Sequence, residues 1–192
     1  MSIQPRLILI TGKARHGKDT IADYCVKQYG FQKYMVAQPL KDICRIMFNF
    51  TESQVNGQDK DTIDERWGIA PRLCLQFVGT ELMREQIGTI LPDVGQNIWI
   101  KCLADKLQRI LATQPDAKFV ISDVRYENEL SFLAVELSLP TISLRVVNPR
   151  VTSTGVTAHC SEEQLFATNH IIENDSTFEH LYQQIDELFK LD

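Results

Sequence analysis

The chain has 192 residues, of which 44% are hydrophobic and 23% charged, a composition typical of a soluble globular protein. Its net charge of -5 argues against a surface that tracks a nucleic acid polymer, so an anionic ligand would need a local basic pocket. Five scattered cysteines without a Cys-x-x-Cys pair argue against a zinc site or a disulfide framework and favour reduced thiols in the cytoplasm. The sequence has no signal-peptide pattern and no run of 18 apolar residues, so we expect no membrane association.

Predicted strands and helices alternate along the chain. The apolar run 7–11 predicts a buried strand, and a helix over 20–28 ending at Gly30, a short strand over 34–36 and a helix over 39–50 follow. Residues 51–69 are polar and predict a connection with room for one helical turn; Pro71 then predicts the start of a helix that runs to about 86. Helices are expected at 97–111, 127–137 and 178–191, and strands at 119–124, 141–147 and 170–173. This order predicts one α/β domain over 1–192, with a mostly parallel sheet and helices on both faces.

A glycine-rich loop separates the first predicted strand from the first helix. It has the Gly-x4-Gly-Lys core of a phosphate-binding loop, and its nine residues are the predicted ATP-binding residues: Gly12, Lys13, Ala14, Arg15, His16, Gly17, Lys18, Asp19 and Thr20. Backbone N–H groups of such a loop form an anion nest, and the helix N-terminus adds its positive dipole. Lys18 would reach the β- and γ-phosphates, whereas His16 would space the backbone or touch phosphate. The alternative is a glycine-rich turn without a ligand.

Two carboxylates are the candidate metal residues. The strict loop pattern has Ser or Thr after the lysine, where this chain has Asp19, so which group orders Mg²⁺ stays open and Asp19 is expected to act through water. Asp123 closes the strand predicted over 119–124, where an acid can orient Mg²⁺-bound water; alternatively it caps the following helix. Arg125 would emerge at the carboxyl end of the sheet and bind an anion, or else pair with Glu127 or Glu129.

Several further motifs occur in order along the chain. They are Pro39-Leu40-Lys41, Trp67-Gly68-Ile69-Ala70-Pro71-Arg72, Leu75-Gln76-x-x-Gly79-Thr80-Glu81-x-x-Arg84, Ile98-Trp99, Asp123-Val124-Arg125-Tyr126-x-Asn128-Glu129, His159-x-Ser161-Glu162 and Ile171-Ile172-Glu173-Asn174-Asp175. Together with the loop they make most of the chain resemble the phage- and virus-type deoxynucleoside monophosphate kinases. The related animal-type phosphomevalonate kinases share the Gly-Lys-Asp loop, the Ile-Trp pair, the Asp-x-Arg and the Ile-Glu-Asn tail.

The resemblance implies a fold and a set of roles. The fold is a P-loop nucleoside-monophosphate-kinase-like three-layer sandwich with a five-stranded parallel sheet and a small lid. The acceptor would bind in a region of about 37–100, and the implied acceptor residues are Lys41, Arg72, Gln76, Arg84 and Arg125. Asn174 would lie near the adenine, or else form a turn before the last helix. Trp99 would stack on a base, although its place at an apolar helix start favours core packing.

The segment after the strand at 141–147 is the candidate lid. It spans about 148–163 and is rich in Thr, Ser, Gly and Val, and its Arg150 is a candidate catalytic cation beside Lys18 and Arg125. An arginine that closes over the γ-phosphoryl group stabilises the charge that spreads during transfer. The alternative for Arg150 is a solvated surface side chain.

The sequence therefore predicts an Mg²⁺-dependent phosphotransferase that converts ATP and a deoxynucleoside monophosphate into ADP and the diphosphate. One alternative is a kinase of a non-nucleotide acceptor such as phosphomevalonate, and another is a nucleotide-dependent switch with no acceptor. The resemblance also suggests a homodimer and a viral origin, hence the host cytoplasm. The preferred base and the choice between deoxyribose and ribose stay open.

Overall fold

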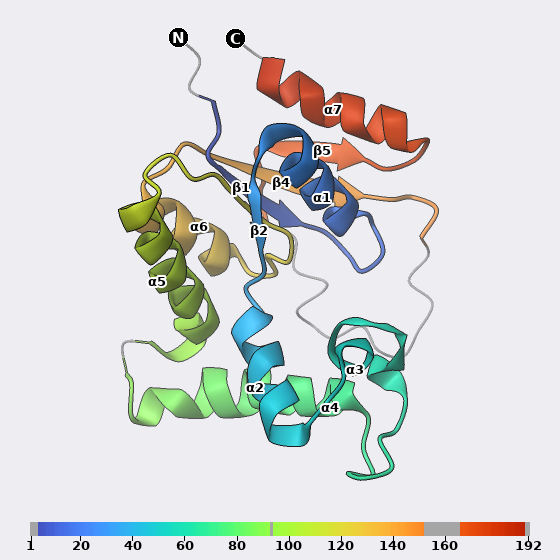
Figure 1. Ribbon diagram of the computed structural model, residues 1–192, viewed down its shortest axis with the longest axis vertical. Coiled ribbons are helices and arrows are strands. Elements are labelled where there is room, and N and C mark those ends of the chain that lie inside the picture. The colour runs from blue at the N-terminus through green and yellow to red at the C-terminus, as the bar shows by residue number, and fades with distance from the viewer. Residues whose placement is uncertain (1–3, 93, 152–165, 191–192) are drawn as a thin grey trace. The chain divides into compact units, whose positions relative to one another are not determined.

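A computed structural model of the chain describes residues 4–92, 94–151 and 166–190 (Figure 1). The chain divides into two compact units. The first is formed by Met1–Met35 with Ala104–Asp192, and the second by Val36–Leu103. In the described part of the chain, no helix has both the length and the apolar character needed to cross a membrane.

The first unit is built on a five-stranded sheet in the order β2-β3-β1-β4-β5, with every neighbouring pair parallel. The strands are β1 (Leu7–Thr11), β2 (Gln32–Tyr34), β3 (Phe119–Ile121), β4 (Thr141–Val147) and β5 (His170–Glu173). Every residue of β1 is buried, because the strand lies at the centre of the sheet with packing on both faces. The predicted α/β class and the five-stranded parallel sheet are confirmed.

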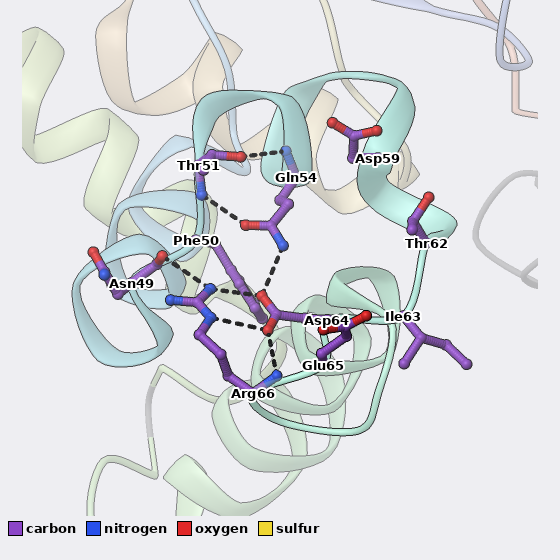
Figure 2. Close-up of a pocket in the computed structure, with 10 residues that line it drawn as sticks. All are labelled: Asn49, Phe50, Thr51, Gln54, Asp59, Thr62, Ile63, Asp64, Glu65 and Arg66. Carbon is purple, nitrogen blue, oxygen red and sulfur yellow. Dashed lines mark hydrogen bonds and ion pairs between the residues drawn. The ribbon is translucent and has the colours of Figure 1, made fainter.

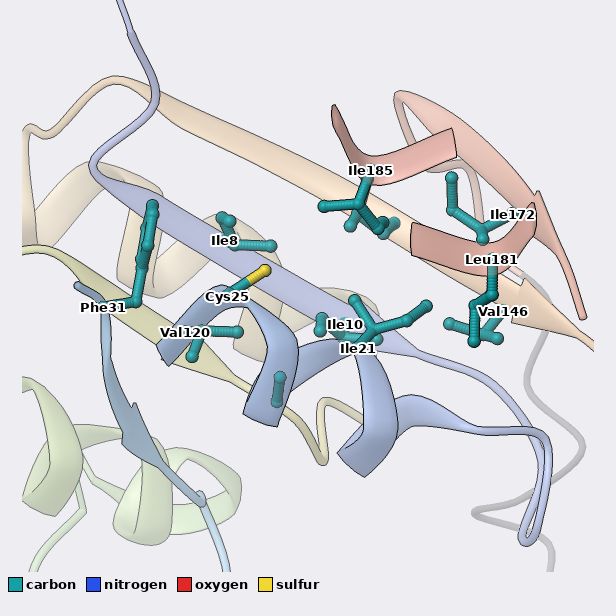
Figure 3. Packing of buried hydrophobic residues seen from close by; sticks show 12 residues of the cluster. Ile8, Ile10, Ile21, Cys25, Phe31, Val120, Val146, Ile172, Leu181 and Ile185 are labelled. Atoms are coloured by element: carbon teal, nitrogen blue, oxygen red, sulfur yellow. The ribbon is translucent and has the colours of Figure 1, made fainter. Parts of the chain in front are cut away.

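Helices α1 (Lys18–Tyr29) and α7 (Phe178–Lys190) pack on one face of this sheet, and α6 (Glu127–Leu137) lies on the other (Figure 1). Figure 3 shows Ile21 of α1 and Ile185 of α7 among the buried strand residues, and both are fully buried. Full burial of one such side chain stabilises the fold by about 1.5–3 kcal/mol. The glycine-rich loop is thus carried by a central strand and by a helix fixed in the main core.

The second unit is mostly helical. It contains α2 (Gln38–Phe48), α3 (Glu52–Asn56), the 3₁₀ turn η1 (Gln58–Asp61), α4 (Pro71–Gln76), the π-helix η2 (Phe77–Gln86), the 3₁₀ turns η3 (Ile87–Thr89) and η4 (Gly95–Asn97), and the start of α5 (Ile98–Thr113). A small core of its own contains buried Cys44, Phe50, Val55, Cys74, Leu75 and Val78. Since α5 continues into the first unit, the chain passes between the units within one helix.

Three predicted elements differ from the structure. The strand predicted at 34–36 runs from Gln32 to Tyr34 instead, because edge strand β2 is defined by its backbone pairing with β3 and not by apolar side chains. The strand predicted at 119–124 ends at Ile121. The helix predicted over 71–86 changes to a π-helix after Gln76, which a search for helical periodicity does not distinguish.

The connection predicted at 51–69 contains more helix than expected. The Thr51 hydroxyl accepts from the Gln54 N–H at 3.3 Å, while the Gln54 side chain accepts from the Thr51 N–H at 2.9 Å. These reciprocal bonds form a capping box, which starts α3 at Glu52.

Candidate active site

The glycine-rich loop joins the carboxyl end of β1 to the first turn of α1. Gly12 and Gly17 have φ values of 143° and 103°, which L side chains rarely adopt. A Cβ on Gly12 would lie 2.5 Å from the Val146 carbonyl oxygen, and one on Gly17 would lie 2.5 Å from Nδ2 of Asn174. The loop therefore needs glycine at both positions to pass this close to β4 and to the end of β5.

The N-terminus of α1 is suited to an anion. Its N-cap residue is Gly17, and no side chain caps the first turn. N–H groups of a first helical turn have no partner within the helix, so a phosphate oxygen would satisfy them. The Lys18 ammonium donates to the carbonyl oxygens of Gly12 and Lys13, at 2.8 Å each, and so lies across the loop.

Asp19 is held from two sides in the first turn of α1. Its Oδ1 accepts from the hydroxyl of buried Ser122 at 2.9 Å and forms an ion pair with Lys33 at 2.8 Å. Burial opposes ionisation of Asp19, but Lys33 and Ser122 together outweigh it, so the pKa of Asp19 is lowered. The carboxylate stays ionised and oriented at neutral pH.

Asp123 lies beside this arrangement, two residues past the end of β3. The N–H of Ser122 donates to the Tyr34 carbonyl at 3.4 Å, and that of Val124 donates to the Ile10 carbonyl at 3.2 Å. The backbone around Asp123 therefore continues alongside β2 and β1 after the strand ladder ends. This places Asp123 at the sheet edge from which the glycine-rich loop leaves.

Oxygen ligands of this kind suit Mg²⁺, which commonly uses one or two carboxylates together with water and phosphate oxygens. The pair Asp19 and Asp123 fits that pattern. Among the described residues, no group of three or more His, Cys, Asp or Glu side chains is placed to hold a metal ion by itself, so Mg²⁺ would also need water and phosphate oxygens as ligands.

Arg125 is exposed, and its backbone is fixed by Glu129. The Glu129 carboxylate is almost fully buried and accepts from the N–H groups of Arg125 at 2.8 Å and Tyr126 at 3.3 Å. Glu129 thus caps the start of α6 and sets the turn that presents Arg125. The suggestion that Asp123 caps this helix is wrong, since the N-cap residue is Tyr126.

His16 faces the end of β4. Its ring is buried, and Nδ1 accepts from the Asn148 N–H at 3.2 Å and lies 3.3 Å from the Val146 carbonyl oxygen. Burial is the main reason that the pKa of His16 is lowered, and the charges of Lys18 and Lys13 add to it. The ring therefore lies between the loop and the end of β4.

Asn174 supports the loop from the end of β5. Its Nδ2 donates to the His16 carbonyl oxygen at 2.9 Å, and its backbone N–H donates to Val147 at 2.8 Å. The side chain is therefore a direct neighbour of the predicted ATP-binding loop.

Only the beginning of the candidate lid is described. The Arg150 N–H donates to the Asn148 side chain at 2.9 Å, and the Arg150 side chain is exposed after this turn. Residues 152–163 of the predicted lid lie outside the described residues.

Four of the five predicted acceptor residues belong to the second unit. Lys41 is in the first turns of α2, Arg72 and Gln76 are in α4, and Arg84 is in η2. The Arg72 guanidinium donates to Asp61 at 2.9 Å, and that of Arg84 donates to the Gln96 carbonyl at 2.8 Å. Arg125 belongs to the first unit.

Trp99 packs in the core and is 3% exposed, so it is not placed to stack on a base. Its indole N–H donates to the carbonyl oxygen of Gly79 in the π-helix at 2.9 Å. A Cβ on Gly79 would lie 2.7 Å from Cδ2 of Leu40, so η2 also packs closely on α2. These contacts fix the helix that carries Arg84.

A cavity of about 740 Å³ in the second unit lies beside α3 and the turn at 62–66, and none of the predicted site residues lines it. Figure 2 shows Asp64 at its centre, accepting from Gln54 at 2.7 Å and from the Arg66 guanidinium at 2.6 Å and 2.9 Å. The Arg66 guanidinium holds the pKa of Asp64 far below its usual range. Because these polar groups bond one another, we infer that their role is structural and that they fix the conformation of the turn.

Comparisons with known proteins show the family of the chain. The family model for deoxynucleotide monophosphate kinase matches residues 6–64, which include the glycine-rich loop. The "Putative deoxynucleotide monophosphate kinase" of Acanthamoeba polyphaga mimivirus is 33% identical over 185 residues, which are 93% of each chain. The chain belongs to the deoxynucleotide monophosphate kinase family. Family membership implies ATP as phosphate donor and a nucleotide substrate.

One solved structure with a TM-score above 0.5 supports the fold. A sugar kinase from Janibacter sp. HTCC2649 aligns with a TM-score of 0.53 at 10% identity, covering 97% of this chain and 95% of its own. Shikimate kinase from Aquifex aeolicus aligns with a TM-score of 0.49 at 13% identity over 96% of both chains. At 10% identity the likeness to the sugar kinase concerns the fold alone.

Sequence reasoning missed the roles of three residues that organise the site. Ser122 and Lys33 orient Asp19, and buried Glu129 fixes the turn before α6. A signal existed for Glu129, because an acid three residues into a predicted helix is half of a capping box. Ser122 is next to a predicted metal residue, but its bond to Asp19 spans 103 residues and requires the sheet order.

Proposed function

We propose that this protein transfers the γ-phosphoryl group of ATP to the 5′-phosphate of a deoxynucleoside monophosphate. The observation that carries the proposal is the conjunction of family membership with a loop whose N–H groups, lysine and neighbouring carboxylates suit a Mg²⁺-bound triphosphate. Such a reaction needs little covalent chemistry from the protein, so positioning and charge account for the catalysis.

The donor half of the site would work as follows. Loop N–H groups from Gly12 to Gly17 and the first turn of α1 bind the phosphates, and the Lys18 ammonium exchanges its loop carbonyls for β- and γ-oxygens. Asp19, oriented by Ser122 and Lys33, and Asp123 would hold Mg²⁺ through its water ligands. The metal, when bound, neutralises charge on the transferred group.

The acceptor half would use residues of the second unit together with Arg125. Guanidinium groups of Arg84 and Arg125 would grip the acceptor phosphate bidentately, with Arg72 and Lys41 adding positive charge and Gln76 bonding the base edge. Arg72 already has a carboxylate partner in Asp61, so an entering phosphate would compete with an ion pair. Arg150 would add charge from the predicted lid at 148–163.

An acceptor panel tests this function. ADP release from Mg²⁺-ATP is measured with dTMP, dGMP, dCMP, dAMP and dUMP, with their ribonucleotide counterparts, and with phosphomevalonate. The proposal predicts strong stimulation by at least one deoxynucleotide. Stimulation by phosphomevalonate alone would assign a non-nucleotide acceptor, and ATP binding without stimulated turnover would indicate a switch.

A further inference from the structure

The π-helix η2 changes which side chains share one face of the segment from Arg72 to Arg84. A regular α-helix turns about 100° per residue, so twelve residues would leave Arg84 about 120° around the axis from Arg72. In η2 the hydrogen bonds span five residues instead of four, so each residue turns less than in an α-helix. The drift over the π-helical steps therefore opposes the drift over the α-helical steps from Arg72 to Gln76, and Arg84 returns close to the line of Arg72.

Two series of residues in this segment keep the same exposure every four positions. The half-buried positions include residues 72, 76, 80 and 84, the exposed ones include 73, 77, 81 and 85, and residues 75 and 79 are buried. Arg72, Gln76, Thr80 and Arg84 therefore form one stripe along α4 and η2. Three of these four residues, Arg72, Gln76 and Arg84, are among the five proposed above to bind the acceptor.

Thr80 occupies the stripe between the residue proposed for the base, Gln76, and the residue proposed for the phosphate, Arg84. Eight residues separate those two, which is at most about 12 Å along the helix axis. A nucleotide laid along the stripe would place its sugar against the residue in the middle.

The Thr80 hydroxyl is also available. Helical threonines commonly bond a carbonyl of the preceding turn, as the hydroxyls of Thr89 and Thr113 do, at 2.8 Å to Gln86 and 3.1 Å to Ile110. Thr80 is half-buried, and within the described ranges its hydroxyl bonds neither backbone nor side chain.

Building on the proposed function, we propose that Thr80 is a specificity-determining residue whose hydroxyl hydrogen-bonds the 3′-hydroxyl of the acceptor deoxyribose. The contacts from Trp99 and Leu40 at Gly79 hold the π-helix in the register that aims Thr80 along the stripe. A sugar hydroxyl is common to all deoxynucleotides, so this contact would serve any base.

The test compares a deoxynucleoside monophosphate with its 2′,3′-dideoxy analogue, both carrying the base that the wild-type enzyme accepts best. We expect the wild type to favour the deoxynucleotide in kcat/KM by about tenfold, the size of one net hydrogen bond. Thr80→Val, which keeps the volume, should abolish this preference, while Thr80→Ser should retain it. Thr89→Val is the matched control, since its hydroxyl is used by its own turn, and it should keep the preference.

The results of this experiment distinguish a failure of the inference about Thr80 from a failure of the proposed function. Absence of any deoxynucleotide phosphorylation by the wild type would overturn the proposed function. Phosphorylation with the same preference in Thr80→Val as in the wild type would overturn the role of Thr80 alone, as would an equal loss with both acceptors. Thermal melting checks that the variants fold, and Thr80→Ala replaces Thr80→Val if the latter does not.

Discussion

Replacing Ser122 with alanine should disturb the proposed Mg²⁺ site more than the fold. The change removes the 2.9 Å bond from the Ser122 hydroxyl to Asp19. Hydrogen bonds to charged groups contribute about 1.5–3 kcal/mol. Asp19 keeps its ion pair with Lys33 and is exposed to water, so we expect the free energy of unfolding to fall by only about 1 kcal/mol, a Tm decrease of about 2–4 °C at this chain length.

The functional effect of Ser122→Ala should be larger than this stability effect. A carboxylate held from one side only will orient Mg²⁺ less well, so the Mg²⁺ concentration for half-maximal activity should rise several-fold at constant ATP. Ser143→Ala is the matched control, because the hydroxyl of buried Ser143 in β4 donates to the neutral Asn169 side chain at 2.9 Å. It should lower Tm similarly and leave the Mg²⁺ dependence unchanged. Equal Mg²⁺ dependence in both variants would refute the role given to Asp19.

The pH dependence of stability gives a second test of the Ser122–Asp19 hydrogen bond. The pKa of Asp19 is lowered from its ordinary 3.8 in the folded state, so its contribution to stability is present above that value. The contribution is lost as the pH falls through the lowered pKa. The Tm difference between Ser122→Ala and the wild type should therefore narrow below about pH 4.

The remaining predictions concern the loop and the thiols. Gly17→Ala should abolish ATP binding in a calorimetric titration, because its Cβ would lie 2.5 Å from the Asn174 side chain. Gly30→Ala is the control: with φ 70° and no atom within 4 Å, it should cost about 1–2 kcal/mol of stability and keep ATP binding. Normal ATP affinity in Gly17→Ala would contradict the close packing of the loop. Burial raises the pKa of the Cys25 thiol to about 12. Iodoacetamide at pH 8 should therefore modify exposed Cys102 in the native protein and Cys25 only after unfolding, as measured by peptide mass mapping. Rapid modification of Cys25 in the native protein would contradict its burial.

The central elements could be predicted because their sequence signals match their burial. The run 7–11 is apolar throughout, since β1 is packed on both faces, and the glycines that follow are required by positive φ angles. The number of strands in the sheet was predicted from the resemblance of the motifs to a known family. These features depend on residues that are adjacent in the sequence, so local patterns contain the information.

The rest depends on contacts between distant residues. The π-helix arises where Trp99 bonds the Gly79 carbonyl and Leu40 packs on Gly79, and no local period signals this. Strand β2 has the partly polar sequence Gln-Lys-Tyr and is half-buried at the end of the described sheet, so a search for apolar runs placed it two residues late. The orientation of Asp19 by Ser122 likewise exists only once β3 lies beside β1.

The most direct test of the central claim follows the phosphoryl group itself. Wild-type protein is incubated with ATP labelled at the γ-phosphorus, Mg²⁺ and each deoxynucleoside monophosphate, and the products are separated. The account predicts label in a deoxynucleoside diphosphate, reduced at least about 100-fold in Lys18→Met. Label that stays in ATP or appears only as inorganic phosphate with every deoxynucleotide would contradict it.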